Sequence, residues 1–192
     1  YGIYAYGLHN LTVDNCRINM TAGTWIHLEY YPSTEWFLIS NSFGFNGGTG
    51  LRNRMSNGTL LNCELHNFTN GITGRALDPT ILNITGNTFY GCTYGYRGLT
   101  SGIAKALQLY LIDNDFLYCT TAISAVENPN GIFMNNTISH CDFGFHTSVP
   151  DLQGCILRFN EYTDVGTAIH VEGDLYDHPN GLVVANETIV DC

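Results

Sequence analysis

Three stretches of twelve residues follow one pattern: ITGNTFYGCTYG at 84–95, LIDNDFLYCTTA at 111–122 and FMNNTISHCDFG at 133–144. Each stretch has asparagine at its fourth position, phenylalanine or isoleucine at its sixth and cysteine at its ninth, and each ends on glycine or alanine. A motif that returns at nearly even spacing indicates a solenoid, in which each copy of the motif packs on the next.

The repeat extends over the whole chain when the central asparagine is used as an anchor. Residues three before and two after each anchor are apolar, and a second short segment follows each closing glycine or alanine. This alternation predicts short strands with one buried face. In the second copy it places Trp36, Leu38 and Phe43 in the core. The anchors are Cys16, Asn41, Cys63, Asn87, Asn114, Asn136, Asn160 and Glu187.

Anchor spacings of 22 to 27 residues are typical of one coil of a right-handed parallel β-helix. We therefore predict an all-β fold, a single right-handed parallel β-helix (β-solenoid) of about eight coils, forming one domain over 1–192 with no cap at either end. The asparagines are expected to occupy left-handed turn positions and to bond to the next coil through their amides. Asn41 is assigned to the same row as Asn87, Asn114, Asn136 and Asn160.

The repeated pattern N-x-[F/I/L]-x-x-C-x-x-G resembles the pectate-lyase-like right-handed β-helix superfamily over nearly all of the chain. Within that superfamily it is most similar to the short-coil repeats of carbohydrate-binding, sugar-hydrolase and cell-surface proteins. The Asn-Thr-Asp, Asp-Asp, Gly-His-Gly and Arg-Ile-Lys motifs of polygalacturonase-type enzymes do not occur here. The resemblance therefore implies the fold and leaves the chemistry open.

Composition excludes some partners. The net charge is −10 and only 12% of residues are charged, which argues against a nucleic-acid partner because phosphate binding needs a basic face. No apolar run approaches the roughly 18 residues of a membrane span. No cofactor is expected.

Cysteines and sequons bear on the cellular location. Cys92, Cys119 and Cys141 share one position in successive coils and could form either a disulfide or a stack of buried thiols; we favour the thiols. Their spacing predicts no metal site. Seven Asn-x-Thr sequons predict N-glycosylation and export to an extracellular, cell or virion surface, although a β-helix is also simply rich in Asn and Thr. Asn83 should point outward, whereas Asn135, beside the turn row, is a candidate for burial. The sequons are at Asn10, Asn19, Asn57, Asn67, Asn83, Asn135 and Asn186.

Four of the seven basic residues, Arg52, Arg54, Arg75 and Arg97, are expected on one face of three successive coils. Stacked like charges need a partner, either carboxylates such as Glu29 and Asp78 or an anionic ligand. The two interpretations are a structural ion-pair network and a groove for an acidic sugar, whose carboxylate a guanidinium binds in a bidentate manner.

A second cluster on the same face contains His146, His170 and Glu172, followed by Asp174, Asp177 and His178 in the next loop. His146, His170 and Glu172 are the candidates for catalysis, because such a group can do acid–base work or bind a metal. The alternative is a solvated polar edge, which we favour, so no metal site is predicted.

Two functions follow from these features. The first is an extracellular structural solenoid of a surface layer or fibre, glycosylated and stacked end to end with copies of itself or with further coils of a longer chain. The second is a carbohydrate-active module, a lyase, hydrolase or binding domain, that acts on an acidic polysaccharide through its arginine face. Whether the protein is an enzyme stays open.

Overall fold

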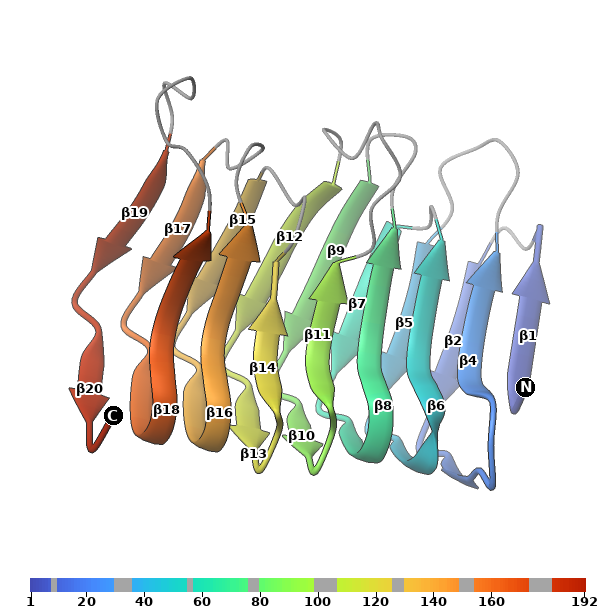
Figure 1. The fold of residues 1–192 in the computed structure, drawn as a ribbon. Coiled ribbons are helices and arrows are strands. Elements are labelled where there is room, and N and C mark those ends of the chain that lie inside the picture. Colours follow the sequence, from blue (N-terminus) through green and yellow to red (C-terminus); the bar gives the residue numbers. More distant parts are fainter. Residues whose placement is uncertain are drawn as a thin grey trace.

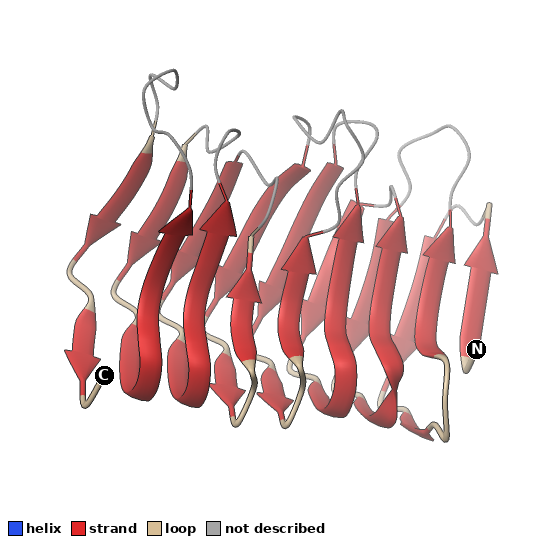
Figure 2. Ribbon diagram, viewed as in Figure 1, coloured by secondary structure: helices blue, strands red, loops and turns tan. Residues whose placement is uncertain are grey.

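The computed structural model describes residues 1–7, 10–29, 36–54, 57–75, 80–98, 107–125, 130–148, 154–172 and 181–192. Every regular element in these ranges is a β-strand, as Figure 2 shows, and every paired strand runs parallel to its neighbours. The strands form a right-handed parallel β-solenoid, and the predicted fold class is confirmed.

Two sheets run the length of the solenoid and face each other across the core (Figure 1). Sheet B is the rear, eight-stranded sheet of Figure 1. Its strands are β2 (Asn10–Asp14), β5 (Trp36–Ser40), β7 (Asn57–Leu61), β9 (Thr80–Thr85), β12 (Leu107–Ile112), β15 (Asn130–Met134), β17 (Cys155–Arg158) and β19 (Leu182–Ala185).

Sheet A has twelve strands and bends in the middle. Four of its strands continue through the bend, and the others lie on one side of it. The continuous strands are β6 (Phe43–Arg54), β8 (Glu64–Arg75), β16 (Thr137–Ser148) and β18 (Glu161–Glu172). The shorter ones are β1 (Ile3–Tyr6), β3 (Arg17–Asn19), β4 (Thr24–Glu29), β10 (Thr88–Tyr90), β11 (Tyr94–Gly98), β13 (Asp115–Leu117), β14 (Thr121–Ser124) and β20 (Thr188–Val190).

The solenoid has about six turns, whereas the anchors predicted about eight. In the coils from β5 to β18 each strand pairs with a strand on both sides. The anchors also count the segments at the two ends, where strands such as β2 and β19 pair on one side among the described residues.

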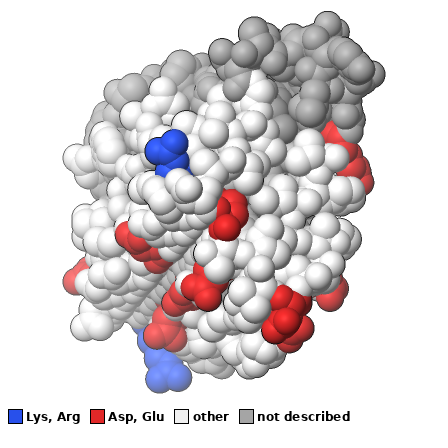
Figure 3. Space-filling view, turned by 90° about the vertical axis from the view of Figure 1, so that its left-hand side faces the viewer, with Lys and Arg blue, Asp and Glu red and all other residues white. Residues whose placement is uncertain are grey.

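Seen from the end formed by β19 and β20, the surface carries few charged groups, most of them acidic (Figure 3). Val183, Val184 and Ile189 are exposed there.

An asparagine ladder runs from coil to coil along the buried corner between sheet B and sheet A. The Oδ1 of Asn114 accepts a hydrogen bond from the backbone N–H of Asn87 at 3.0 Å, and its Nδ2 donates to the carbonyl of Ile84 at 2.9 Å. Asn87, Asn136 and Asn160 make the same two contacts from their own coils. Each amide therefore satisfies buried backbone groups of the preceding coil. The predicted bond to the next coil is also present, because Nδ2 of Asn87, Asn114 and Asn136 donates to Oδ1 of the following ladder asparagine.

The left-handed backbone angle belongs to the residue before the ladder and not to the ladder asparagine. Asn62, Asp113 and Asn135 have φ of 52°, 57° and 55° and turn the chain from sheet B into sheet A. The prediction that combined both roles in one asparagine was wrong, because turning the backbone and bonding to the next coil require different side-chain directions.

The second copy is shifted by one residue from its predicted alignment. Asn41 has φ of 47° and takes the turn position, while the hydroxyl of Ser42 accepts from the N–H of Cys16 at 3.1 Å and takes the ladder position. The core residues shift with it: Phe37 and Ile39 are buried, and Trp36 and Leu38 are exposed. The position predicted for Phe43 belongs to Gly44.

Trp25 explains why a glycine is tolerated at that core position. A Cβ on Gly44 would lie 2.8 Å from the Cδ2 atom of the indole ring, so the fully buried Trp25 occupies the space. In the middle coils the equivalent residues are Phe89 and Phe116, whose rings stack at 4.8 Å between centroids. The core keeps its volume by sharing it between neighbouring coils.

Candidate functional site

The arginine face lies on the outer side of sheet A, beyond the bend. Strand register places Arg52, Thr73 and Arg97 in one row along the solenoid axis, because Arg52 pairs with Thr73 and Thr73 pairs with Arg97. Arg54 and Arg75 are paired in the next row. The expected gathering of arginines on three successive coils is therefore present in the strand register. Arg75 is described by its backbone only.

Arg54 is neutralised by a carboxylate on the neighbouring strand. Its Nη1 lies 2.6 Å from Oε1 of Glu29, and the hydroxyl of Tyr4 donates to Oε2 of the same carboxylate at 3.1 Å. Glu29 is therefore one of the carboxylates that were expected to offset the charges of the stacked arginines. Asp78, the other expected partner, lies outside the described residues. For Arg54 the structural interpretation holds.

Between Arg52 and Arg97 the central strand β8 contains two buried polar atoms that lack hydrogen-bond partners among the described residues. Thr73 is only 4% exposed, and its Oγ1 has no partner. The Oδ1 of Asn70, whose residue pairs with Tyr94, is buried and also without one. Buried polar atoms that make no hydrogen bond cost stability.

The outer positions beside β8 carry groups suited to a sugar acid. The guanidinium of Arg97 lies 4.7 Å from the centroid of the Tyr94 ring, a cation–π contact that fixes both side chains. Arg52 is half-buried on the other side. Burial, assisted by the charge of Arg52, lowers the pKa of His27 in the same row. We define Arg52, Asn70, Thr73, Tyr94 and Arg97 as the β8 site.

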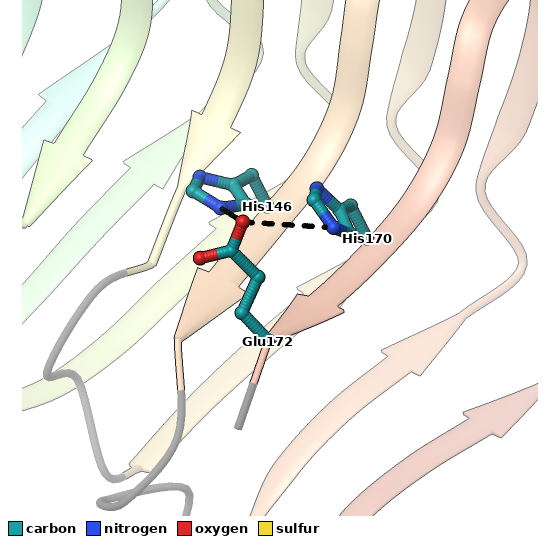
Figure 4. Close-up of side chains that lie close together, drawn as sticks. All are labelled: His146, His170 and Glu172. Carbon is teal, nitrogen blue, oxygen red and sulfur yellow. Dashed lines mark ion pairs between the residues drawn. The ribbon is translucent and has the colours of Figure 1, made fainter.

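The second cluster lies farther along the same row. His146 pairs with His170 in adjacent strands, and both Nε2 atoms approach Oε1 of Glu172, at 3.9 and 3.7 Å (Figure 4). The expected grouping of the three residues is present. Asp174, Asp177 and His178 lie outside the described residues. The arrangement can carry protons or hold a cation.

A row of exposed and half-buried aromatic side chains was not predicted from the sequence. It crosses the outer face of sheet A on the other side of the bend, with ring centroids 4.7 to 5.4 Å apart. Arg17 lies over the rings at its first end, 5.2 Å from the Phe43 centroid. The signal was weak because these residues come from different positions of the repeat. The row contains Phe43, His66, Tyr90, Tyr118 and His140.

The three cysteines of the repeat are free and buried, as the favoured interpretation expected. The thiol of Cys119 lies between those of Cys141 and Cys92, and these two neighbours together with burial raise the pKa of Cys119. Each thiol donates a weak hydrogen bond to a carbonyl of the preceding coil, for example Cys92 to Leu65 at 3.5 Å. A neutral thiol of this kind is a core side chain.

The sequon asparagines differ in exposure. Asn57 and Asn83 are half-buried, and the Oδ1 of Asn57 accepts from the backbone N–H of Ile81 at 2.7 Å. Asn135 is exposed because it is the left-handed turn residue beside the ladder, so the suggestion that it is buried was wrong. The exposed sequon asparagines are Asn10, Asn19, Asn67, Asn135 and Asn186.

The parallel coils and their ladders define a β-solenoid. The family model for the right-handed β-helix region matches residues 1–192, and the chain belongs to that family. Comparison with curated proteins and with solved structures finds no match. The described residues contain no helix that is long and apolar enough to span a membrane.

Proposed function

We propose that the protein binds an acidic polysaccharide along the outer face of sheet A, at the β8 site. The observation that carries the proposal is the row in which an arginine stands on each side of β8, Arg52 on β6 and Arg97 on β11. A uronic acid offers a carboxylate for the guanidinium groups.

The shape of the face supports an extended ligand. Arg52, Thr73 and Arg97 follow one another along the axis at one coil each, about 4.8 Å per coil. A chain of sugars laid along the axis meets a new side chain at every coil. Because the protein as a whole carries a charge of −10, attraction of an anion is local to this face and should weaken as salt is added.

Titration with polygalacturonate, followed by calorimetry, tests the proposal. We expect binding that the Arg52→Ala/Arg97→Ala variant loses by at least about tenfold. Arg158→Ala on sheet B is the matched control, because it removes one cationic side chain from another face. Neutral dextran should not bind. Equal affinities in wild type and the double variant would refute the proposal.

A second proposal is a structural role at an extracellular, cell or virion surface. It rests on the exposed sequon asparagines and on the apolar outer edge of β19 and β20, which further coils or a second copy of the chain would cover. Mass spectrometry of the protein secreted by a glycosylating host should find glycans on Asn67 and Asn135, and electron microscopy at rising concentration should find filaments. Unmodified discrete particles would remove this role.

A further inference from the structure

We propose that His146, His170 and Glu172 form a binding site for a divalent transition-metal ion of the zinc class. This site is independent of the polysaccharide proposal, because it uses other residues and its test needs no sugar. The proposal rests on the convergence of two imidazole nitrogens on a single carboxylate oxygen.

The backbone positions the three side chains. His146 lies in β16 and His170 in β18, and the two residues are paired neighbours in parallel strands. Glu172 stands two residues after His170 and therefore on the same side of β18. Two hydrogen-bonded strands of a six-turn solenoid form a rigid base, so the positions of the three Cα atoms are set before any ion binds.

The distances are close to those of a metal site. The ligand atoms of the three residues all lie within 4.8 Å of one another, and the two imidazoles stand 3.9 and 3.7 Å from Oε1. Two ligands bound tetrahedrally at about 2.1 Å from an ion lie about 3.4 Å apart. A small rotation of the side chains closes the difference without moving the strands.

The donor set selects the ion. Two neutral imidazoles and one carboxylate suit Zn²⁺, Co²⁺ and Ni²⁺, whereas Mg²⁺ and Ca²⁺ prefer all-oxygen sites. Three protein ligands leave at least one coordination position open to water or to a ligand. The imidazole of His146 is 27% exposed and that of His170 is 39% exposed, so an ion can enter from solvent.

Phe143 restricts the rings on the strand side. Its ring stacks on His170 at 5.8 Å and lies 6.2 Å from His146, between centroids. The same strands also contain a simpler pair, His140 and Asp164, at 3.5 Å. That pair has one imidazole instead of two, and it is therefore a matched control on the same two strands.

Calorimetric titration with Zn²⁺, repeated with Co²⁺ and its visible absorption, tests the site. We expect one ion to bind at this site, and His146→Ala, His170→Ala and Glu172→Gln each to lower the affinity by at least about tenfold, because each removes one of three ligands. His140→Ala should leave the affinity unchanged, and Mg²⁺ should not compete. The proposal is overturned if wild type and His146→Ala/His170→Ala bind Zn²⁺ and Co²⁺ alike, or if neither binds. Circular dichroism of each variant checks that the solenoid is intact, and Glu172→Gln, which keeps the shape of an exposed side chain, remains the decisive variant if an alanine variant does not fold.

Discussion

The coils between residues 80 and 148 and the coil between residues 36 and 54 contribute strands to the same two sheets but contain different side chains. The former contain Asn87, Asn114 and Asn136 in the ladder and large apolar residues in the core. The latter has Ser42 in the ladder and Gly44 in the core. The solenoid therefore requires a polar atom for the backbone of the preceding coil and a filled interior, and several residue types meet both requirements.

The largest expected effect concerns Trp25 of β4, which fills the core position beside Gly44 of the next coil. Trp25→Ala should lower the free energy of unfolding by about 3–5 kcal/mol, because it leaves a cavity beside Gly44 that no other side chain fills. Urea denaturation followed by circular dichroism measures the change. Gly44→Leu should destabilise the wild type and partly restore the stability of Trp25→Ala. If the double variant is no more stable than Trp25→Ala, the two coils do not share this space.

The ladder gives the next effect and compares the two regions directly. Asn114→Ala should cost about 2–4 kcal/mol, because the N–H of Asn87 and the carbonyl of Ile84 lose their buried partners. Ser42→Ala should cost about 1 kcal/mol, since among the described residues its hydroxyl bonds to Cys16 and Ser40 alone. Urea midpoints of both variants test the order. Equal losses would mean that the asparagine ladder adds nothing beyond one hydrogen bond per coil.

The smallest effect lies where the ladder ends on a carboxyl group. The Nδ2 of Asn160 donates to Oε1 of Glu187 at 3.3 Å, and burial raises the pKa of Glu187 above its ordinary value. The folded state therefore holds the proton more tightly than the unfolded chain. The resulting stabilisation is complete below the pKa that Glu187 has in the unfolded chain, and it is lost as the pH rises through the higher pKa that Glu187 has in the folded state.

Glu187→Gln should remove this pH dependence and make the last coil more stable than the wild type at neutral pH. Thermal unfolding of both proteins at several pH values measures the difference, which should grow from pH 4 to pH 7. The other carboxylates are common to both proteins and cancel in the comparison. A difference that does not change with pH would show that Glu187 has the same pKa in the folded and unfolded chains.

Much of the fold followed from the sequence because a solenoid repeats its local interactions. The residues before and after Asn87, Asn114 and Asn136 alternate in the same way, so the strands, the ladder and the cysteine row could be assigned without any long-range information. Asn41 and Ser42 defeated the same reasoning. Either side chain fits the ladder, and only the pairing of Ile39 with Leu60 fixes the register.

The candidate sites could be predicted only as rows. Strand spacing was enough to bring Arg52 near Arg97 and His146 beside His170. It could not show that Glu29 neutralises Arg54 or that the carboxylate of Glu172 turns toward both imidazoles. These features depend on side-chain rotamers and on burial by neighbouring coils.

The sequence by itself therefore determined the class of fold and the order of its coils, since each copy of the motif specifies the same strands and turns. The tertiary structure decided which side chains face one another across those coils. The backbone of a parallel sheet sets its repeat along the axis, but the distances between functional atoms depend on how each side chain packs against the next coil.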